Sequence, residues 1–477
     1  MCGILGIYGK NEVAEELING LTALQHRGQD AAGVVTFDGR FRMKKGLGQV
    51  SSVFRSKNLA RLHGNCGIGH VRYATIGSTD VLDAQPHAVN YPFGLAMVHN
   101  GNVVNFMQLR KSLYEENHRL LETSNDVALI LYSFASELEK KNLKKLTVND
   151  IFDTVEAVQK RVLGAYSAIS IIANRGFLAF TDPYGIRPIV MGVKRTRKGK
   201  QYAFASETTC FDYLGYELER NLEPGEIVFI DTKGKVHSEI RHRKERAFCI
   251  FEYIYFARED SVILDRLVAS ERVRMAKPLA ERIRKAKLDP DIIIDVPTSS
   301  YFFASGIAED LKIPYRRGLA KNHHVGRSFI TPNQKKRELM VRQKLNPIRD
   351  VIKGKKIAVV DDSIVRGTTS ARLVSLLKAN GAKKVYFISA APPIKHPCIY
   401  GIDMSIEQEL IASHSNLKQI QKAIDADALI YQSLDDLKEL YKDVHCCYAC
   451  FSGEYPTGVT EEMMKEIAQE KMKSNRV

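Results

Sequence analysis

The sequence predicts two domains of different fold class, a mixed α and β half followed by an α/β half with a parallel sheet. Two observations indicate this. Short apolar or alternating runs separated by turn signals fill the first half, whereas helical stretches alternate with apolar strands in the second. The change follows Lys235–Arg246, where the chain becomes polar and highly charged. We therefore place the boundary near residue 241, which gives domains at 1–240 and 241–477.

The strands of the first half are indicated by Ala165–Ala173, Gly176–Phe180 and Glu226–Ile230, with turn signals at Asp182–Gly185 and Glu223–Gly225 between them. Short strands joined by tight turns indicate a domain of mixed α and β structure.

The strands of the second half are indicated by the apolar runs Asp291–Val296, Ile357–Val360 and Val385–Ser389. A parallel sheet covered by helices needs apolar side chains on both faces of its strands, so these runs predict such a sheet.

The composition is that of an ordinary globular protein, with 477 residues of which 44% are hydrophobic and 26% charged. No run of 18 apolar residues and no secretory leader is visible, so we expect a cytoplasmic protein with no membrane partner. The net charge of +15 raises nucleic-acid binding as an alternative, but the basic residues are spread widely and no nucleic-acid-binding motif accompanies them. We therefore expect no nucleic-acid partner. Small polyanionic substrates such as phosphates suit the same charge.

The most informative stretch of the second half is Lys356–Ser370. A buried strand is followed by the acidic pair Asp361 and Asp362, a turn rich in Gly, Thr and Ser, and a helix-like run to Asn380. Backbone N–H groups at a helix N-terminus suit a phosphate, and paired carboxylates suit sugar hydroxyls or Mg²⁺. The stretch therefore predicts a phosphosugar site. The alternative is a plain βα turn with solvated charges.

In the first half, Cys2 is preceded only by Met1. Removal of that methionine would leave a cysteine with a free α-amino group, which is a nucleophile that carries its own base. We expect maturation to require only this removal. Alternatively, Cys2 is simply the second residue of a strand.

Four further motifs follow Cys2 in order: Leu24–Gly33 (LQHRGQDAAG), Gly69–Gly77 (GHVRYATIG), His99–Asn105 (HNGNVVN) and Ser124–Asp126 (SND). Together with the first residues they resemble the glutamine amidotransferase domain of the N-terminal-nucleophile class. Asp182–Pro188 and Ser206–Thr208 resemble the same domain type. The resemblance implies the αββα sandwich of an N-terminal-nucleophile hydrolase.

This resemblance also implies a role for each residue of the glutamine site. Cys2 is the nucleophile, and the side-chain amide of Asn100 and the backbone N–H of Gly101 form the oxyanion hole. The glutamine-binding residues are Arg72 for the α-carboxylate, Asp126 for the α-ammonium, and His70 and Thr75 lining the pocket. Taken singly, these residues also fit an Arg on a strand and an Asn-Gly hairpin turn.

In the second half, Val359–Ser370 (VVDDSIVRGTTS) looks like the phosphoribosyl-pyrophosphate (PRPP) motif of type I phosphoribosyltransferases. The resemblance implies that Asp361 and Asp362 bind the ribose hydroxyls and organise Mg²⁺. The residues implied around the 5′-phosphate are Ser363, Arg366, Gly367, Thr368, Thr369 and Ser370. Asp295–Ser300 resembles the pyrophosphate loop, with Ser299 as a Mg²⁺ contact. Lys321–Arg337 would be a lid, with Lys321 at PRPP; a surface loop is the alternative.

Four of the eight cysteines form a second set. The contexts of Cys249 and Cys398 and the pair Cys447 and Cys450 resemble the amidophosphoribosyltransferases that carry a [4Fe-4S] cluster, for which four thiolates are the usual ligands. Cys446 adjoins Cys447, but only Cys447 gives the C-x-x-C spacing to Cys450. Structural zinc and unligated thiols remain as alternatives.

Taken together, the two halves resemble the amidophosphoribosyltransferase family. The resemblance implies release of ammonia from glutamine at Cys2, its internal passage to C1 of PRPP, and the first committed step of de novo purine nucleotide biosynthesis. It also implies feedback inhibition by purine nucleotides and a homotetramer. Two alternatives are a different glutamine amidotransferase, against which the PRPP motif argues, and a binding protein without turnover, against which the intact set around Cys2 argues.

Overall fold

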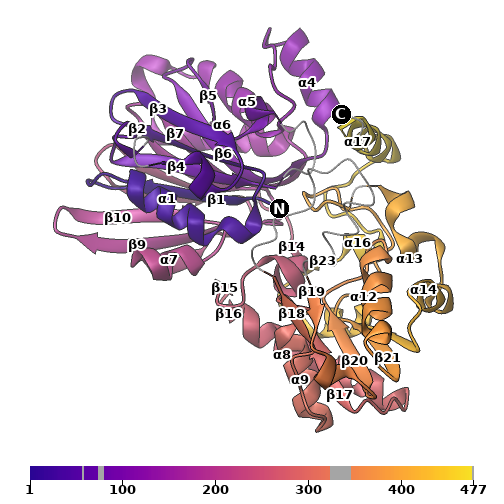
Figure 1. Cartoon of the computed structure of the whole chain (residues 1–477). Coiled ribbons are helices and arrows are strands. Elements are labelled where there is room, and N and C mark those ends of the chain that lie inside the picture. Colours follow the sequence, from indigo (N-terminus) through magenta and orange to yellow (C-terminus); the bar gives the residue numbers. More distant parts are fainter. Residues whose placement is uncertain (56–58, 74–79, 323–344, 405, 475–477) are drawn as a thin grey trace.

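The computed structural model describes residues 1–55, 59–73, 80–322, 345–404 and 406–474 (Figure 1). Thr75 and most of the predicted lid lie outside these residues. No helix within the described ranges is both long and apolar enough to span a membrane.

The first domain contains two antiparallel sheets that stack on each other. One has seven strands in the order β11-β9-β10-β1-β4-β2-β3, and the other has six in the order β13-β12-β8-β7-β6-β5. The bounds of the first are β1 (Gly3–Tyr8), β2 (Ala31–Phe37), β3 (Phe41–Leu47), β4 (Cys66–Arg72), β9 (Val190–Thr196), β10 (Gly199–Ala205) and β11 (Glu217–Asn221). Those of the second are β5 (His87–Val89), β6 (Leu95–Val103), β7 (Gly164–Ile172), β8 (Gly176–Thr181), β12 (Glu226–Asp231) and β13 (Val236–Ile240).

Three apolar layers explain this arrangement. A core between the sheets joins Ile4 and Ile68 of one to Val98 and Ile169 of the other. Helices α1 (Ala14–Ala23), α2 (Val50–Val53) and α7 (Thr209–Leu214) pack on the outer face of the seven-stranded sheet. Helices α4 (Phe106–Glu115), α5 (Val127–Glu139) and α6 (Val148–Arg161) pack against the six-stranded sheet. The predicted αββα sandwich is confirmed.

The second domain is built on a parallel sheet of four strands, β17 (Ile292–Asp295), β20 (Lys356–Asp361), β21 (Lys384–Ser389) and β22 (Ala428–Tyr431), in that order. Helices α8 (Val268–Lys285) and α9 (Tyr301–Leu311) cover one face, and α12 (Thr368–Ala379) and α14 (Leu417–Ala423) cover the other. The three predicted strands are confirmed, whereas β22 was not predicted. Its run, Ala428–Tyr431, contains a single β-branched residue, whereas each predicted run of this domain contains at least two.

Shorter elements complete the second domain. They are β15 (Val262–Ile263), β16 (Arg266–Leu267), β18 (Leu319–Lys321), β19 (Leu345–Pro347), α11 (Arg349–Ile352), α13 (Ile411–His414), α15 (Leu434–Leu440), α16 (Ala449–Ser452) and α17 (Glu461–Ser474). The sheet of β17 and β20 has its carboxyl edge toward the loops at Val296–Ser300 and Asp362–Gly367, which is where ligands bind in open parallel sheets.

The two domains share a buried junction. Strand β14 (Phe248–Cys249) pairs in parallel with β23 (Cys446–Cys447), so two segments far apart in the sequence meet there. One apolar cluster runs from Ala165 and Ile186 of the first domain to Ile254 and Tyr400 of the second. The N-terminus lies where the domains meet (Figure 1). The predicted boundary near residue 241 falls between β13 and β14.

Candidate active sites

Cys2 lies at the meeting point of the two sheets. It directly precedes β1, which pairs with β4, and its N–H donates to Oδ1 of Asn100 on β6 of the opposite sheet at 3.1 Å. Its Sγ lies 3.5 Å from the backbone N of Tyr73. Among the described residues, Nδ2 of Asn100 is buried without a hydrogen-bond partner. The amide therefore binds the backbone of Cys2 through its oxygen and has an N–H group without a partner.

Gly101 continues the same strand, and its conformation requires glycine. Its φ is +148°, and a Cβ there would lie 1.8 Å from the carbonyl oxygen of Ala165. Asn100 and Gly101 thus place a side-chain amide and a backbone N–H next to each other on β6. Two such donors are what a developing oxyanion needs.

Arg72 ends β4 and is buried, with Nη2 at 3.9 Å from Oδ2 of Asp83. Asp83 in turn accepts hydrogen bonds from the backbone N and Oγ of Ser124 and from Oγ1 of Thr123, at 3.1, 2.8 and 2.6 Å. The predicted motif at Ser124–Asp126 is therefore tied to Arg72 through an aspartate that sequence reasoning missed.

Asp126 is held by two donors. Its Oδ2 accepts from the backbone N of Val103 at 3.0 Å and forms an ion pair with Nε2 of His99 at 3.2 Å. Burial alone would raise the pKa of Asp126, but the charge and hydrogen bond of His99 outweigh it and the pKa is lowered. Asp126 is thus kept as a carboxylate, as binding of an ammonium group requires.

His70 lies on β4 and is fully buried. Burial first, and then the nearby His99 and Arg72, hold the pKa of His70 well below its ordinary value. Neither ring nitrogen has a hydrogen-bond partner within the described part of the chain. His70 is therefore a neutral side chain with unused polar atoms near Arg72, as a pocket residue would be.

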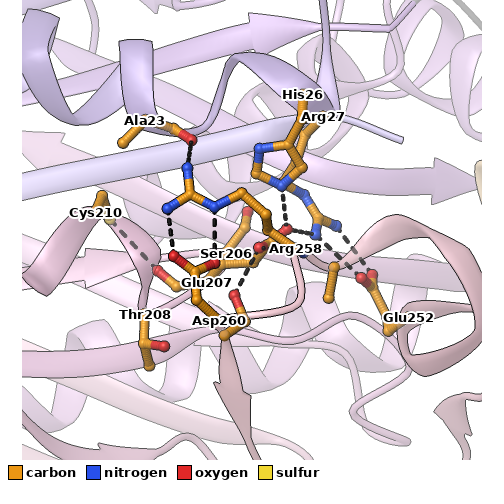
Figure 2. A network of polar contacts seen from close by, with 12 residues as sticks. Ala23, His26, Arg27, Ser206, Glu207, Thr208, Cys210, Glu252, Arg258 and Asp260 are labelled. Carbon is orange, nitrogen blue, oxygen red and sulfur yellow. Dashed lines mark hydrogen bonds and ion pairs between the residues drawn. The ribbon is translucent and has the colours of Figure 1, made fainter. Parts of the chain in front are cut away.

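A buried charge network connects Cys2 to the second domain (Figure 2). Nε of Arg27 donates to the carbonyl oxygen of Cys2 at 2.9 Å, and its two Nη atoms pair with the carboxylate of Glu252 at 3.0 Å each. Glu252 opens the π-helical turn Glu252–Phe256, which follows β14. Arg27 lies in the motif Leu24–Gly33 and Glu252 lies close to Cys249, but neither residue was assigned a role from the sequence alone.

Glu207 is the second acid of this network. It pairs with Arg27 and, at 2.9 Å, with Nε2 of His26, and its other oxygen accepts from the backbone N of Arg258 at 3.0 Å and Oγ of Ser261 at 2.7 Å. Burial opposes ionisation, but His26 and Arg27 outweigh it, so the pKa of Glu207 is lowered. The ionised Glu207 joins the first domain to the chain just after the π turn.

In the second domain, Asp361 and Asp362 lie at the carboxyl end of β20, as predicted. Oδ2 of Asp362 accepts from Oγ of Ser299 at 2.5 Å, and Oδ1 accepts from Oγ of Ser363 at 2.8 Å. Burial and the charge of Asp362 raise the pKa of Asp361 well above its ordinary value. Two carboxyl groups that oppose each other's ionisation favour a cation between them.

The loop after the aspartates leads into the N-terminus of α12. Gly367 has φ +75° at the start of this helix, and Thr368 and Thr369 are exposed in its first turn, while Ser370 is buried. The open first turn suits a phosphate. Arg366 is exposed and pairs with Glu409, with Nε at 2.9 Å from Oε2. Lys321 ends β18 with an exposed side chain, next to the residues that are not described.

The four predicted cluster cysteines gather at the domain junction. Cys249 and Cys447 are partners in the β14–β23 pair, and the backbone N of His396 donates to the carbonyl oxygen of Cys450 at 3.0 Å. Burial, and then Cys398, Cys447 and Cys249, raise the pKa of the Cys450 thiol. Over the described ranges, no group of three or more His, Cys, Asp or Glu side chains is compact enough to hold a single metal ion.

Known proteins resemble this chain over both of its domains. A family model described as a glutamine amidotransferase domain matches residues 70–213. An amidophosphoribosyltransferase of Pasteurella multocida (strain Pm70) is 44% identical over 486 residues, which cover 99% of this chain and 96% of the relative. The structure of glutamine PRPP amidotransferase from B. subtilis complexed with ADP and GMP has a TM-score of 0.86 at 38% identity, covering 97% of this chain and 98% of that chain. A structure described as the allosteric regulatory enzyme of purine biosynthesis gives a TM-score of 0.87 at 38% identity, covering 97% of each chain.

The fold and the two sites define a glutamine amidotransferase of the N-terminal-nucleophile type that is joined to a phosphoribosyltransferase domain. More narrowly, the chain belongs to the amidophosphoribosyltransferase family. Its reaction transfers ammonia from glutamine to C1 of PRPP, giving 5-phosphoribosylamine, glutamate and pyrophosphate, the first step of purine nucleotide biosynthesis.

Proposed function

We propose that Cys2 is the nucleophile of the glutaminase half-reaction. The observation that carries this proposal is the contact between the N of Cys2 and Oδ1 of Asn100, while Nδ2 of the same amide has no partner among the described residues. The α-amine takes the proton of the Cys2 thiol, and the sulfur attacks the carboxamide carbon of glutamine. The same proton then passes to the departing ammonia, which leaves a thioester. Water hydrolyses the thioester and releases glutamate. Asn100 and Gly101 stabilise the oxyanion in both steps.

An α-amine at this end of the chain is buried. Burial, the largest influence, together with Arg187 and Arg27 lowers the pKa of the amino group of Met1 to about 5, below the value of about 7.7–8.0 of an ordinary α-amine. Once Met1 is removed, the amine of Cys2 becomes the terminal group and acts as the base.

Glutamine is bound by its α-groups. Arg72 pairs with the α-carboxylate, and Asp126, which is kept ionised by His99, pairs with the α-ammonium. His70 and Thr75 complete the pocket, and Asp83 positions Arg72.

In the second domain, PRPP binds across the ends of β17 and β20. Asp361 and Asp362 take the ribose hydroxyls, and the first turn of α12 takes the 5′-phosphate. The carboxyl pair and Ser299 would hold Mg²⁺, which supplies positive charge to the leaving pyrophosphate. Lys321 and the lid would cover the site and exclude water.

The ammonia passes internally from Cys2 to C1 of PRPP. A Cys2→Ala variant should lose glutamine-dependent synthesis of phosphoribosylamine and keep synthesis from added ammonia. In the parent protein, unlabelled ammonia in the medium should not dilute the label from amide-¹⁵N glutamine. A Cys2→Ala variant that keeps glutamine-dependent turnover would contradict the assignment of the nucleophile.

The chain would belong to the members that hold a [4Fe-4S] cluster, with Cys249, Cys398, Cys447 and Cys450 as ligands. Their place at one junction, where three are buried and Cys447 is half-buried, and their mutual electrostatic effects support this set. Such a cluster would link the C-terminal segment to β14. None of the eight cysteines, all of which lie within the described ranges, forms a disulfide, which fits the reducing cytoplasm.

Purine nucleotides are the proposed feedback inhibitors. The B. subtilis relative is described as complexed with ADP and GMP, and the other solved relative as an allosteric regulatory enzyme. A homotetramer is the proposed assembly. Sedimentation analysis with and without these nucleotides tests both proposals, and a monomer at micromolar concentration would contradict the assembly.

A further inference from the structure

One segment of the second domain, Cys398–Gly401, lies directly against the oxyanion-hole strand of the first. A Cβ on Gly401 would lie 2.9 Å from the carbonyl oxygen of Gly101 and 3.1 Å from its carbonyl carbon. Gly401 has a φ of +99°, so the backbone there also favours glycine. Two glycines from different domains thus pack backbone to backbone.

Two side chains of the first domain hold this segment in place. Nδ2 of Asn102, the residue after Gly101 on β6, donates to the carbonyl oxygen of Ile399 at 2.8 Å. Nε of Arg187 donates to the carbonyl oxygen of Tyr400 at 2.9 Å, and its Nη2 donates to the same oxygen. Asn102 and Arg187 are only 4% and 1% exposed. Two consecutive carbonyl groups are therefore bound by buried donors.

Arg187 also connects the segment to the charge network around the nucleophile. Its Nη1 lies 3.7 Å from Oε1 of Glu252, the carboxylate that pairs with Arg27. Arg27, whose pairing with Glu252 is drawn in Figure 2, donates to the carbonyl oxygen of Cys2. The nucleophile and the oxyanion hole are thus both supported from the second domain, through Glu252 and through Cys398–Gly401.

We infer that the segment Cys398–Gly401 supports the glutaminase oxyanion hole by packing against Gly101. Asn102 and Arg187 are positioning residues, because they hold this segment in place. This inference rests on the proposed role of Asn100 and Gly101. The Cα of Gly101 joins the N–H that donates to the oxyanion and the carbonyl against which Gly401 packs. A displacement of that carbonyl changes the direction of the N–H bond of Gly101. Because oxyanion donors act only at about 2.7–3.1 Å from the developing charge, this change weakens the stabilisation of the oxyanion.

The test is Gly401→Ala, with Gly354→Ala as the matched control. Gly354 has φ +74°, and no described atom lies within 4 Å of a Cβ built there, so the control carries the backbone strain without the contact. Gly401→Ala should lower kcat for glutamine-dependent synthesis at least tenfold relative to Gly354→Ala, with KM for glutamine unchanged. Loss of one oxyanion donor costs about 10²–10³ in kcat, which sets the upper range.

Two readouts separate a displaced oxyanion hole from general damage. Ammonia-dependent synthesis should stay within twofold of the control, because it does not use the hole. Alkylation of Cys2 by iodoacetamide, followed by mass spectrometry of the N-terminal peptide, should also be unchanged, because it needs only the thiol. Equal kcat values for the two variants, or a parallel fall in all three readouts, would overturn the inference.

A second variant decides the matter if Gly401→Ala does not fold. Asn102→Ala removes the donor to Ile399 without adding an atom, and it should lower the glutamine-dependent kcat while ammonia-dependent synthesis persists. An unchanged kcat would overturn the inference. A parent protein that makes phosphoribosylamine from ammonia but not from glutamine would refute the proposed glutaminase function itself. That result can be told apart from the ones that overturn the present inference, because those are seen in the variants and not in the parent.

Discussion

Ser299 and Asp362 are hydrogen-bonded across the ends of two neighbouring strands, with Oγ at 2.5 Å from Oδ2, although 63 residues separate them in the chain. Among the influences on the pKa of Asp362, burial raises it most, and the hydrogen bond from Ser299 is the largest opposing one. The loop Val296–Ser300 and the aspartate pair are therefore held together by this contact.

The first prediction concerns this contact. Ser299→Ala should raise the KM for PRPP about tenfold or more, because a hydrogen bond to a charged group contributes about 1.5–3 kcal/mol. Glutaminase activity without PRPP should not change. Steady-state kinetics with Mg²⁺ in excess checks this, and Ser305→Ala, whose hydroxyl bonds only locally to the carbonyl of Phe302, is the control. A KM equal to that of the control would mean that Ser299 takes no part in binding.

The second prediction concerns pH. The pKa of Asp361 is raised in the folded state, so the folded protein binds this proton more tightly than the unfolded chain does. Without Mg²⁺, stability should therefore fall as the pH rises from about 4, the ordinary carboxyl value, through the raised pKa. Asp361→Asn should remove this part of the decrease and melt at a higher temperature than the parent at pH 7 in EDTA. It should also lose PRPP-dependent synthesis. Identical melting profiles of parent and variant between pH 4 and 7 would contradict the prediction.

The third prediction concerns the charge network. Glu252→Ala leaves the buried Arg27 without its bidentate partner, and removal of one member of a buried pair costs about 3–5 kcal/mol in the free energy of unfolding. Urea unfolding measures this. Glu439→Ala, which breaks the exposed pair with Lys442, should leave the unfolding midpoint unchanged. If the two variants unfold alike, the network is screened and does not support the junction.

The fourth prediction concerns the cysteines. Purified without oxygen, the protein should be brown and contain four iron and four sulfide per chain, as a [4Fe-4S] cluster requires. Cys450→Ser should abolish the colour, whereas Cys446→Ser should keep it because the ligand is its neighbour Cys447. A colourless parent protein that contains zinc would refute the cluster.

Much of the architecture could be predicted because it follows from local patterns. The runs Ile357–Val360 and Ala165–Ala173 are apolar, and each motif that indicates one of the two sites is a short contiguous stretch. Their chemistry can therefore be inferred without knowing the fold.

The residues that were missed act through contacts between distant segments. Asp83 is an ordinary aspartate until the fold brings it to Ser124 and Arg72. Glu252 lies in an apolar run, where burying a carboxylate is unfavourable in free energy. Its pairing with Arg27 of the first domain offsets this penalty. An unpaired acid in such a run is the one signal that could have pointed to it.

The contact between Gly101 and Gly401 also has a consequence during synthesis on the ribosome. Asn102 and Ile399 are 297 residues apart, so the glutaminase sandwich emerges long before the segment that supports its oxyanion hole. A nascent chain thus carries Cys2 without a finished hole until the acceptor domain has been translated. On the proposed role of Gly401, the order of the two domains in the chain would delay the first release of ammonia until the domain that consumes it has been made.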